Sequence, residues 1–162
     1  FLRAEPFYEV GGFDWDLFAH MEEIDLCWRL KNKGYKIMCE PKSSVFHVGG
    51  GTLSNGSKFK TYLNYRNNLL MLYKNLNSEK RLSTLIKRML LDAISSLKFI
   101  LNGKPQHVLY ILKAHLKYYT LLSSFKKKRP HSYQAKLFPK SIVYLYFVKG
   151  FKTFDQLNKD FN

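Results

Sequence analysis

A cluster of carboxylates is the feature of this sequence best suited to acid–base chemistry. Glu22, Glu23 and Asp25 lie within four consecutive positions, at the start of a segment with regularly spaced apolar residues. A carboxylate within hydrogen-bond reach of a hydroxyl group, about 2.6 to 3.2 Å, can accept the proton when that hydroxyl attacks another molecule. Acids in the first turn of a helix are also stabilised by the helix dipole, by roughly 0.3 to 1 kcal/mol, so a purely structural role remains an alternative.

A second candidate for chemistry is His47, which follows two apolar residues and lies shortly before three consecutive glycines. An imidazole nitrogen can bind Mn²⁺ beside carboxylates, whereas Mg²⁺ prefers oxygen ligands. A single histidine beside apolar residues is more often a structural residue, so both interpretations stay open. The glycines lack the spacing of a phosphate-binding P-loop.

The elements that must position these residues can be predicted from periodicity. Apolar residues recur at near-helical spacing from Ile24 to Leu30, and Gly34 suits the position after a helix end, so we predict a helix over residues 22–33. Alternation over residues 35–40 predicts a short strand that Pro41 ends, and residues 44–48 predict a second strand. The Gly/Ser/Asn-rich residues 49–58 are expected to form a loop.

The remainder of the chain has a helical pattern. We predict helices from about Lys60 to Leu76, over residues 79–101, and from Pro105 toward Phe125, and the apolar segment 141–148 also favours a helix. Nowhere does the sequence contain about 18 consecutive apolar residues, so we expect no membrane-spanning helix.

Charge divides the chain into two unlike parts. Residues 1–47 carry six Lys and Arg against eight Asp and Glu, whereas residues 48–162 carry 21 against four. Basic amphipathic helices can lie on an anionic membrane surface, or pack on a core and leave a solvated basic face. A basic, aromatic-rich region also suits nucleic-acid binding, but the sequence has no RRM, KH or zinc motif, so we do not expect nucleic acid as a partner.

The two cysteines are informative about the compartment. Cys27 and Cys39 have neither the spacing of a zinc site nor the number needed for a disulfide framework. We therefore expect a reducing, cytoplasmic location, and the basic helices add the inner face of the cell membrane as an expected place of contact.

One long segment resembles a known family. The string GGFDWDLFAHMEEIDLCWRLKNKGYKIMCEPKSSVFHVGG is similar to the second half of the catalytic domain of family 2 glycosyltransferases, and the similarity extends from Phe1 to about Asn75. The resemblance implies an α/β fold, with a partial nucleotide-sugar-binding GT-A domain in residues 1–60 and a basic, amphipathic helical extension in residues 61–162. The chain would then be a piece of a longer enzyme, inactive alone.

The family's chemistry implies roles for individual residues. Members of the family transfer a sugar from a nucleotide-sugar donor to an acceptor, such as a bacterial cell-surface glycan or a lipid-linked glycan, and invert the configuration of the anomeric carbon. The second acid of the motif is the catalytic base, which places that role on Glu23; the family usually has Asp there, so Glu22 stays an alternative. Asp25 would be structural or would orient the acceptor. His47 matches a histidine that binds the divalent metal, Mn²⁺ or Mg²⁺, in a number of relatives.

Three further features are interpreted with the family in view. Asp14-Trp15-Asp16 has the spelling of the family's metal-binding Asp-X-Asp motif, but it follows Gly11-Gly12-Phe13, so we interpret it as a false match. Arg66 could bind the donor diphosphate or be solvated on a helix surface. Residues 49–58 resemble a loop that closes over the donor. The rival hypothesis is a basic helical module that binds membrane or nucleic acid without catalysis.

Overall fold

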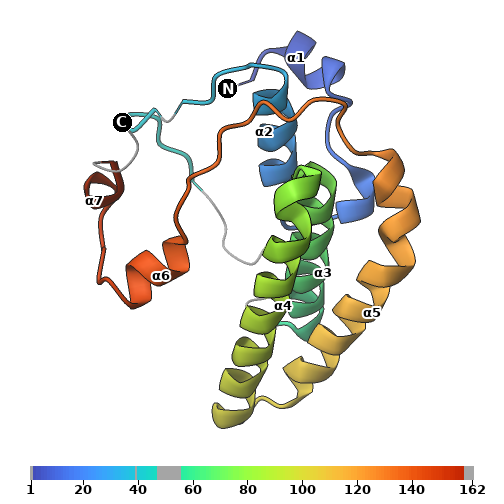
Figure 1. The fold of residues 1–162 in the computed structure, drawn as a ribbon, viewed down its shortest axis with the longest axis vertical. Helices are drawn as coiled ribbons and strands as arrows, with labels where there is room; N and C mark the ends of the chain where they lie inside the picture. The colour runs from blue at the N-terminus through green and yellow to red at the C-terminus, as the bar shows by residue number, and fades with distance from the viewer. Residues whose placement is uncertain (1, 39, 47–55, 159–162) are drawn as a thin grey trace.

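All regular structure in the described part of the chain is helical. The structure is a computed structural model that describes residues 2–38, 40–46 and 56–158 (Figure 1). Within these ranges the helices are α1 (Ala4–Glu9), the 3₁₀-helix η1 (Trp15–Leu17), α2 (Glu22–Asn32), α3 (Lys58–Asn75), α4 (Ser78–Leu101), α5 (Gln106–Lys127), α6 (Ile142–Phe147) and α7 (Phe154–Asn158). The predicted helices that begin near residues 22, 60, 79, 105 and 141 are confirmed.

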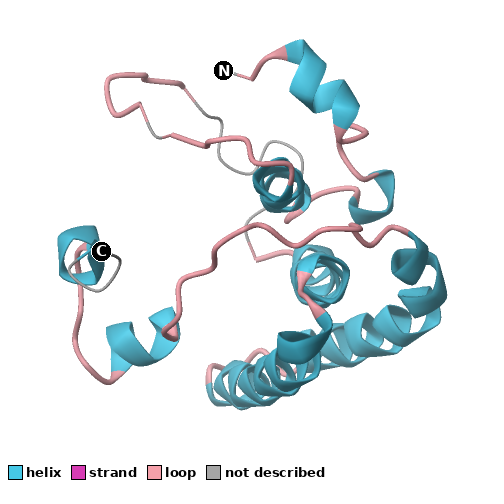
Figure 2. Cartoon of the chain, turned by 45° about the horizontal axis from the view of Figure 1, so that its top comes forward, coloured by secondary structure: helices cyan, strands magenta, loops and turns pink. Residues whose placement is uncertain are grey.

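The α/β fold and its partial GT-A domain are wrong for the described residues. Residues 35–38 and 40–46 form turns and coil instead of strands, and Figure 2 shows only helix and loop. A strand is stable only when neighbouring backbone groups satisfy its N–H and C=O groups, and no described segment supplies such a neighbour. The apolar side chains of the predicted strands are also not buried, because Ile37 is 47% exposed and Val45 85%.

The core lies where α3 meets α4, α5 and η1. The side chains that form it are buried, and they come from residues far apart in the sequence: Leu17, Leu69, Leu70, Leu85, Tyr118 and Phe125. Figure 1 shows α3 lying among α2, α4 and α5, so that one helix contacts all the others of this group. Residues 1–60 and the later helices therefore share packing through α3.

Local signals explain where the long helices begin and end. The side chain of Ser57 accepts a hydrogen bond from the Lys60 amide at the start of α3, and Asn77 does the same for the Lys80 amide at the start of α4. A turn containing Gly103, whose φ of 68° suits glycine, joins α4 to α5. None of the helices in the described residues is long and apolar enough to cross a membrane.

Candidate carboxylate site at the start of helix α2

A glycine turn sets the direction of the chain before the acidic cluster. Gly11 and Gly12 have φ values of 80° and 65°, which residues with a side chain rarely adopt. A Cβ atom on Gly12 would also lie 3.1 Å from the ring of Phe7. Asp14 then caps η1, because its carboxylate accepts a hydrogen bond from the Asp16 amide at 3.2 Å.

The loop between η1 and α2 has a strained backbone. Phe18, His20 and Met21 all have positive φ, at 62°, 68° and 73°, although none of them is glycine. Each such residue costs about 1 to 3 kcal/mol and persists only where its surroundings enforce it. Strain of this kind gathers at functional sites, and here it directly precedes Glu22 and Glu23.

Helix α3 supplies the group that holds the loop. The side-chain amide of Asn67 is fully buried and donates to the carbonyl oxygens of Leu17, Ala19 and His20 at 2.7 to 2.8 Å. One amide therefore holds three backbone carbonyl groups of the segment that leads into α2. Buried carbonyl groups without such a donor would each cost about 1 to 3 kcal/mol.

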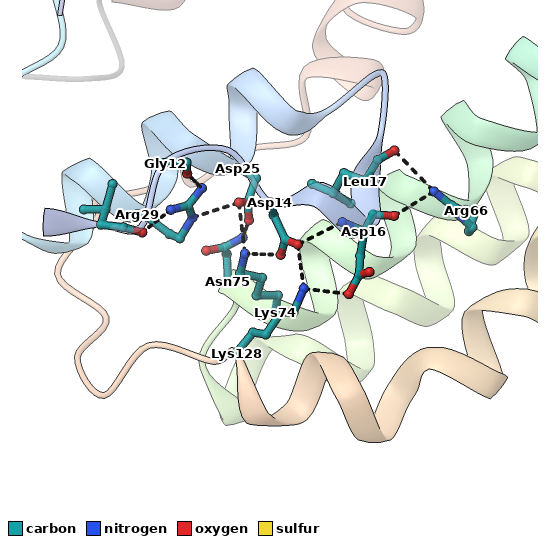
Figure 3. A network of polar contacts seen from close by, with 11 residues as sticks. Gly12, Asp14, Asp16, Leu17, Asp25, Arg29, Arg66, Lys74, Asn75 and Lys128 are labelled. Atoms are coloured by element: carbon teal, nitrogen blue, oxygen red, sulfur yellow. Dashed lines mark hydrogen bonds and ion pairs between the residues drawn. The ribbon is translucent and has the colours of Figure 1, made fainter. Parts of the chain in front are cut away.

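Arg66 also holds this loop. Its guanidinium donates to the carbonyl oxygens of Asp16 at 2.9 Å and Leu17 at 3.2 Å (Figure 3). Its Nε donates to the side-chain oxygen of Asn67 at 2.8 Å. The solvated alternative for Arg66 is wrong, because the residue is buried. Binding of a donor diphosphate stays a prediction, and it would have to replace these backbone hydrogen bonds.

Asp25 is the centre of a buried polar network. It is fully buried; its Oδ1 accepts from the Asn75 amide at 2.7 Å, and its Oδ2 accepts from Arg29 Nε at 2.8 Å and Lys74 Nζ at 3.0 Å (Figure 3). Both oxygens are thus occupied by protein donors. This geometry suits an ionised structural carboxylate and leaves no path by which an acceptor hydroxyl could reach it.

Arg29 extends the network to the glycine turn. Its two terminal nitrogens donate to the carbonyl oxygens of Val10 and Gly12, the latter at 2.6 Å, while its Nε binds Asp25. The guanidinium therefore joins the end of α1 to α2. The Gly-Gly-Phe-Asp sequence and the acidic cluster are parts of one hydrogen-bonded unit.

Asp14 and Asp16 bind lysines. Asp14 accepts from Lys74 Nζ at 2.8 Å and Lys128 Nζ at 2.6 Å, and Asp16 accepts from the same Lys128 nitrogen at 2.7 Å. Burial raises the pKa of the Asp14 carboxyl, but hydrogen bonds and charge from Lys128 and Lys74 outweigh it and leave the pKa below its usual value. The two acids of the Asp14-Trp15-Asp16 sequence therefore belong to a cluster of salt bridges.

Glu22 and Glu23 differ from the acids of the network. Glu23 is exposed at the first turn of α2, and Glu22 is partly buried. The Oε2 atom of Glu22 and the Nε2 atom of His20 are both buried without a hydrogen-bond partner among the described residues. Of the three predicted catalytic acids, Glu23 is the exposed one, so that an external hydroxyl could reach it.

The sequence-based reasoning missed the residues that support the site. One face of α3 is apolar except for three polar residues, Asn67, Lys74 and Asn75, the first two of which are seven positions apart. Polar residues on an apolar helix face could have indicated a buried polar network. Lys128 lies more than a hundred positions from its partners Asp14 and Asp16, and no local pattern marks it.

The predicted metal ligand His47 lies outside the described residues. Within those residues, no group of three or more His, Cys, Asp or Glu side chains is arranged to hold a metal ion. Comparisons with protein-family models, with curated proteins and with solved structures found no match. The resemblance to family 2 glycosyltransferases therefore stays a prediction from the motif.

Proposed function

We propose that this chain is the acceptor-side part of an inverting, nucleotide-sugar-dependent glycosyltransferase whose catalytic base is Glu23. The proposal starts from the ordered motif between Gly11 and Gly50. One observation supports it most: the buried network occupies Asp25 completely, while Glu23 stands exposed directly after a strained loop. The acceptor would be a cell-surface glycan or a lipid-linked glycan.

The proposed reaction is a single displacement. An acceptor hydroxyl oxygen attacks the anomeric carbon of the donor from the face opposite the nucleotide, and the bond between that carbon and the diphosphate oxygen breaks. The bonding electrons leave with the nucleoside diphosphate, and the hydroxyl proton passes to the Glu23 carboxylate. The carboxylate is needed because the hydroxyl becomes acidic only as the new bond forms. One such displacement inverts the anomeric centre.

Glu22 has a supporting part in this proposal. Its carboxylate is partly buried, and because the Oε2 atom is buried, only the other oxygen could accept a hydrogen bond from a second acceptor hydroxyl. A divalent cation, Mn²⁺ or Mg²⁺, would stabilise the leaving diphosphate. The described residues do not form a site for it, so its ligands would be His47 and residues beyond those described.

Substitution of Glu23 tests the assignment. In the natural polypeptide that contains this chain, we expect Glu23→Gln to lower sugar transfer by about 10² to 10⁴-fold, because the amide cannot accept the proton. Donor affinity should change little. Transfer would be measured as nucleoside diphosphate release from UDP-, GDP- and dTDP-sugars with Mn²⁺, with and without acceptor.

A matched control is Glu5→Gln on α1, which removes the same charge from another exposed helical position. It should leave turnover unchanged. Turnover near the wild-type level in Glu23→Gln would remove Glu23 from the base role, and a loss confined to Glu22→Gln would move that role to Glu22. The isolated chain is expected to be inactive in the same assay, since the motif matches only the second half of the family's domain.

A further inference from the structure

Helix α4 has an inner face that packs on the core and an outer apolar face. Leu85 and Asp92 lie on the inner side and are buried. The outer side carries a row of large apolar side chains, three or four positions apart and 51 to 77% exposed: Leu82, Ile86, Leu90, Ile94, Leu97 and Leu101. Because soluble monomers rarely expose a continuous apolar row of this length, the row is a candidate docking surface.

Helix α5 repeats the arrangement. Ile111, Ala114 and Tyr118 are buried, and the residues on the opposite side are apolar and 55 to 68% exposed: Leu109, Leu112, Leu116 and Tyr119. The two helices contact each other where the Tyr119 hydroxyl reaches Met89 Sδ of α4 at 3.7 Å. We call these two rows together the outer hairpin face.

Helix α3 lies on the other side of the hairpin. It contacts α4 through the Tyr65 and Ser95 hydroxyls, and it contacts α5 through Thr61 and His107 at 2.8 Å. Ser95 and His107 are far from the exposed rows around their helices, since each residue turns an α-helix by about 100°. The outer hairpin face therefore points away from the core, and α4 and α5 form one long hairpin (Figure 1).

The hairpin is strongly basic. Residues 78–127 hold ten Lys and Arg against two acids, and one of the acids, Asp92, is buried and paired with Arg88 at 2.8 Å and His115 at 3.0 Å. Lys80, Lys87 and Lys98 are seven and eleven positions apart, so they share one side of α4 beside the apolar row. Lysine side chains in such places can keep their ammonium groups at a lipid headgroup while their stems cover apolar surface.

We infer that the outer hairpin face binds an anionic lipid surface, with α4 and α5 lying in the plane of the membrane. An apolar row beside lysines is the arrangement by which interfacial helices enter the headgroup region. The 24 residues of α4 extend for about 36 Å, which gives a long line of contact. Charge and apolarity together favour a lipid surface over other partners. A second copy of the chain would bring two basic hairpins together, and a nucleic acid would leave the apolar rows in water.

Vesicle binding by the whole chain tests the inference. We expect the protein to sediment with vesicles of phosphatidylcholine and phosphatidylglycerol, and to stay in solution with phosphatidylcholine alone. The triple variant Lys80→Gln, Lys87→Gln, Lys98→Gln should bind the anionic vesicles about a hundredfold more weakly, since each lysine near such a surface contributes roughly a factor of five.

The matched control removes three exposed lysines elsewhere. This control variant carries Lys31→Gln, Lys36→Gln and Lys42→Gln, at lysines of α2 and the following coil, and its net charge is lowered by the same amount. Their combined effect should stay below about tenfold, because salt screens charges beyond about 8 to 10 Å. Equal losses in the two triple variants would overturn the inference, as would equal binding to both kinds of vesicle.

A substitution in the apolar row separates lipid from other partners. Leu90→Asp should abolish vesicle binding, and Leu90→Trp, which stays apolar, should bind and show blue-shifted emission when anionic vesicles are added. The inference fails if Leu90→Asp instead abolishes a dimer in a chain that ignores vesicles, or if the chain binds RNA or DNA in their place. None of these measurements needs a sugar donor, so the outcome is independent of the proposed glycosyl transfer.

Discussion

The role of Asp25 can be tested by the substitution Asp25→Asn. The amide has the same shape as the carboxylate but no charge, and one of its two terminal atoms becomes a donor. Arg29 and Lys74 both donate to Oδ2 of Asp25, so the variant either loses these two charge-assisted bonds or directs its NH₂ group at Asn75. We expect a large loss of stability, because a buried cation is left with an incomplete set of acceptors.

The size of the loss follows from burial. Removing one member of a buried ion pair costs about 3 to 5 kcal/mol. Lys74 keeps its second partner Asp14 at 2.8 Å, and Arg29 keeps two backbone carbonyl groups, so the expected loss is at the lower end, about 3 kcal/mol. Natural domains have free energies of unfolding of about 5 to 15 kcal/mol, so the variant should remain folded but unfold at clearly lower urea concentration.

Urea unfolding followed by circular dichroism at neutral pH measures this difference. Glu23→Gln is the control, because it removes a carboxylate two positions away that is exposed, and surface substitutions of this kind change stability by less than about 0.5 kcal/mol. If Asp25→Asn unfolded with the same midpoint as Glu23→Gln, the buried network would not be what stabilises the link between α2 and α3, and the argument that separates structural from reactive acids would fail.

Three further predictions concern the same region. Asn67→Ala should lower the free energy of unfolding by about 2 to 3 kcal/mol, because buried carbonyl groups of the loop lose their donor. Amide hydrogen exchange in residues 18–21 should also be faster in this variant than in the control variant Asn64→Ala, which changes another residue of the same helix. The Asp14 pKa lies below its usual 3.8, so its stabilising contribution is present above that pH and is lost as the pH falls through the folded pKa; Asp14→Asn should flatten this acid limb of the stability curve. Burial lowers the pKa of Lys128, but hydrogen bonds and charge from Asp14 and Asp16 outweigh this effect and raise the pKa above its usual 10.5. The contribution of Lys128 to the free energy of unfolding should therefore be lost only as the pH rises beyond that value.

The helices were predictable because their signals are local. Apolar periodicity located α2 to α5, and the residue types at Ser57, Asn77 and Gly103 are those that commonly begin or end helices. The strands were not predictable from alternation alone. Residues 35–40 have the period of a strand, but a strand also needs a partner from elsewhere in the chain, and the local pattern contains no information about that partner.

The candidate site was predictable only in part, for a related reason. The acids were visible in the sequence, but their partners Lys74, Asn75 and Lys128 are 49 to 114 positions away. Whether an acid is buried and paired depends on these distant groups, so the sequence alone could not show that Asp25 is buried while Glu23 is exposed.

One short acidic cluster at the start of α2 contains two kinds of carboxylate, which lie on different sides of the helix. Each residue turns an α-helix by about 100°, so Glu23, two positions before Asp25, lies about 160° from it around the axis. Arg29, four positions after Asp25, lies only about 40° away and binds its carboxylate. Glu22 lies about 60° from Asp25, which accounts for its partial burial. The buried apolar residues Leu26 and Leu30 lie about 100° and 140° from Asp25 but about 60° and 20° from Glu23, so helix geometry alone does not assign Asp25 to the interior. The donors Lys74 and Asn75 of α3 do so, because they bind Asp25, whereas Glu23 is exposed to solvent, where an acceptor hydroxyl can reach it.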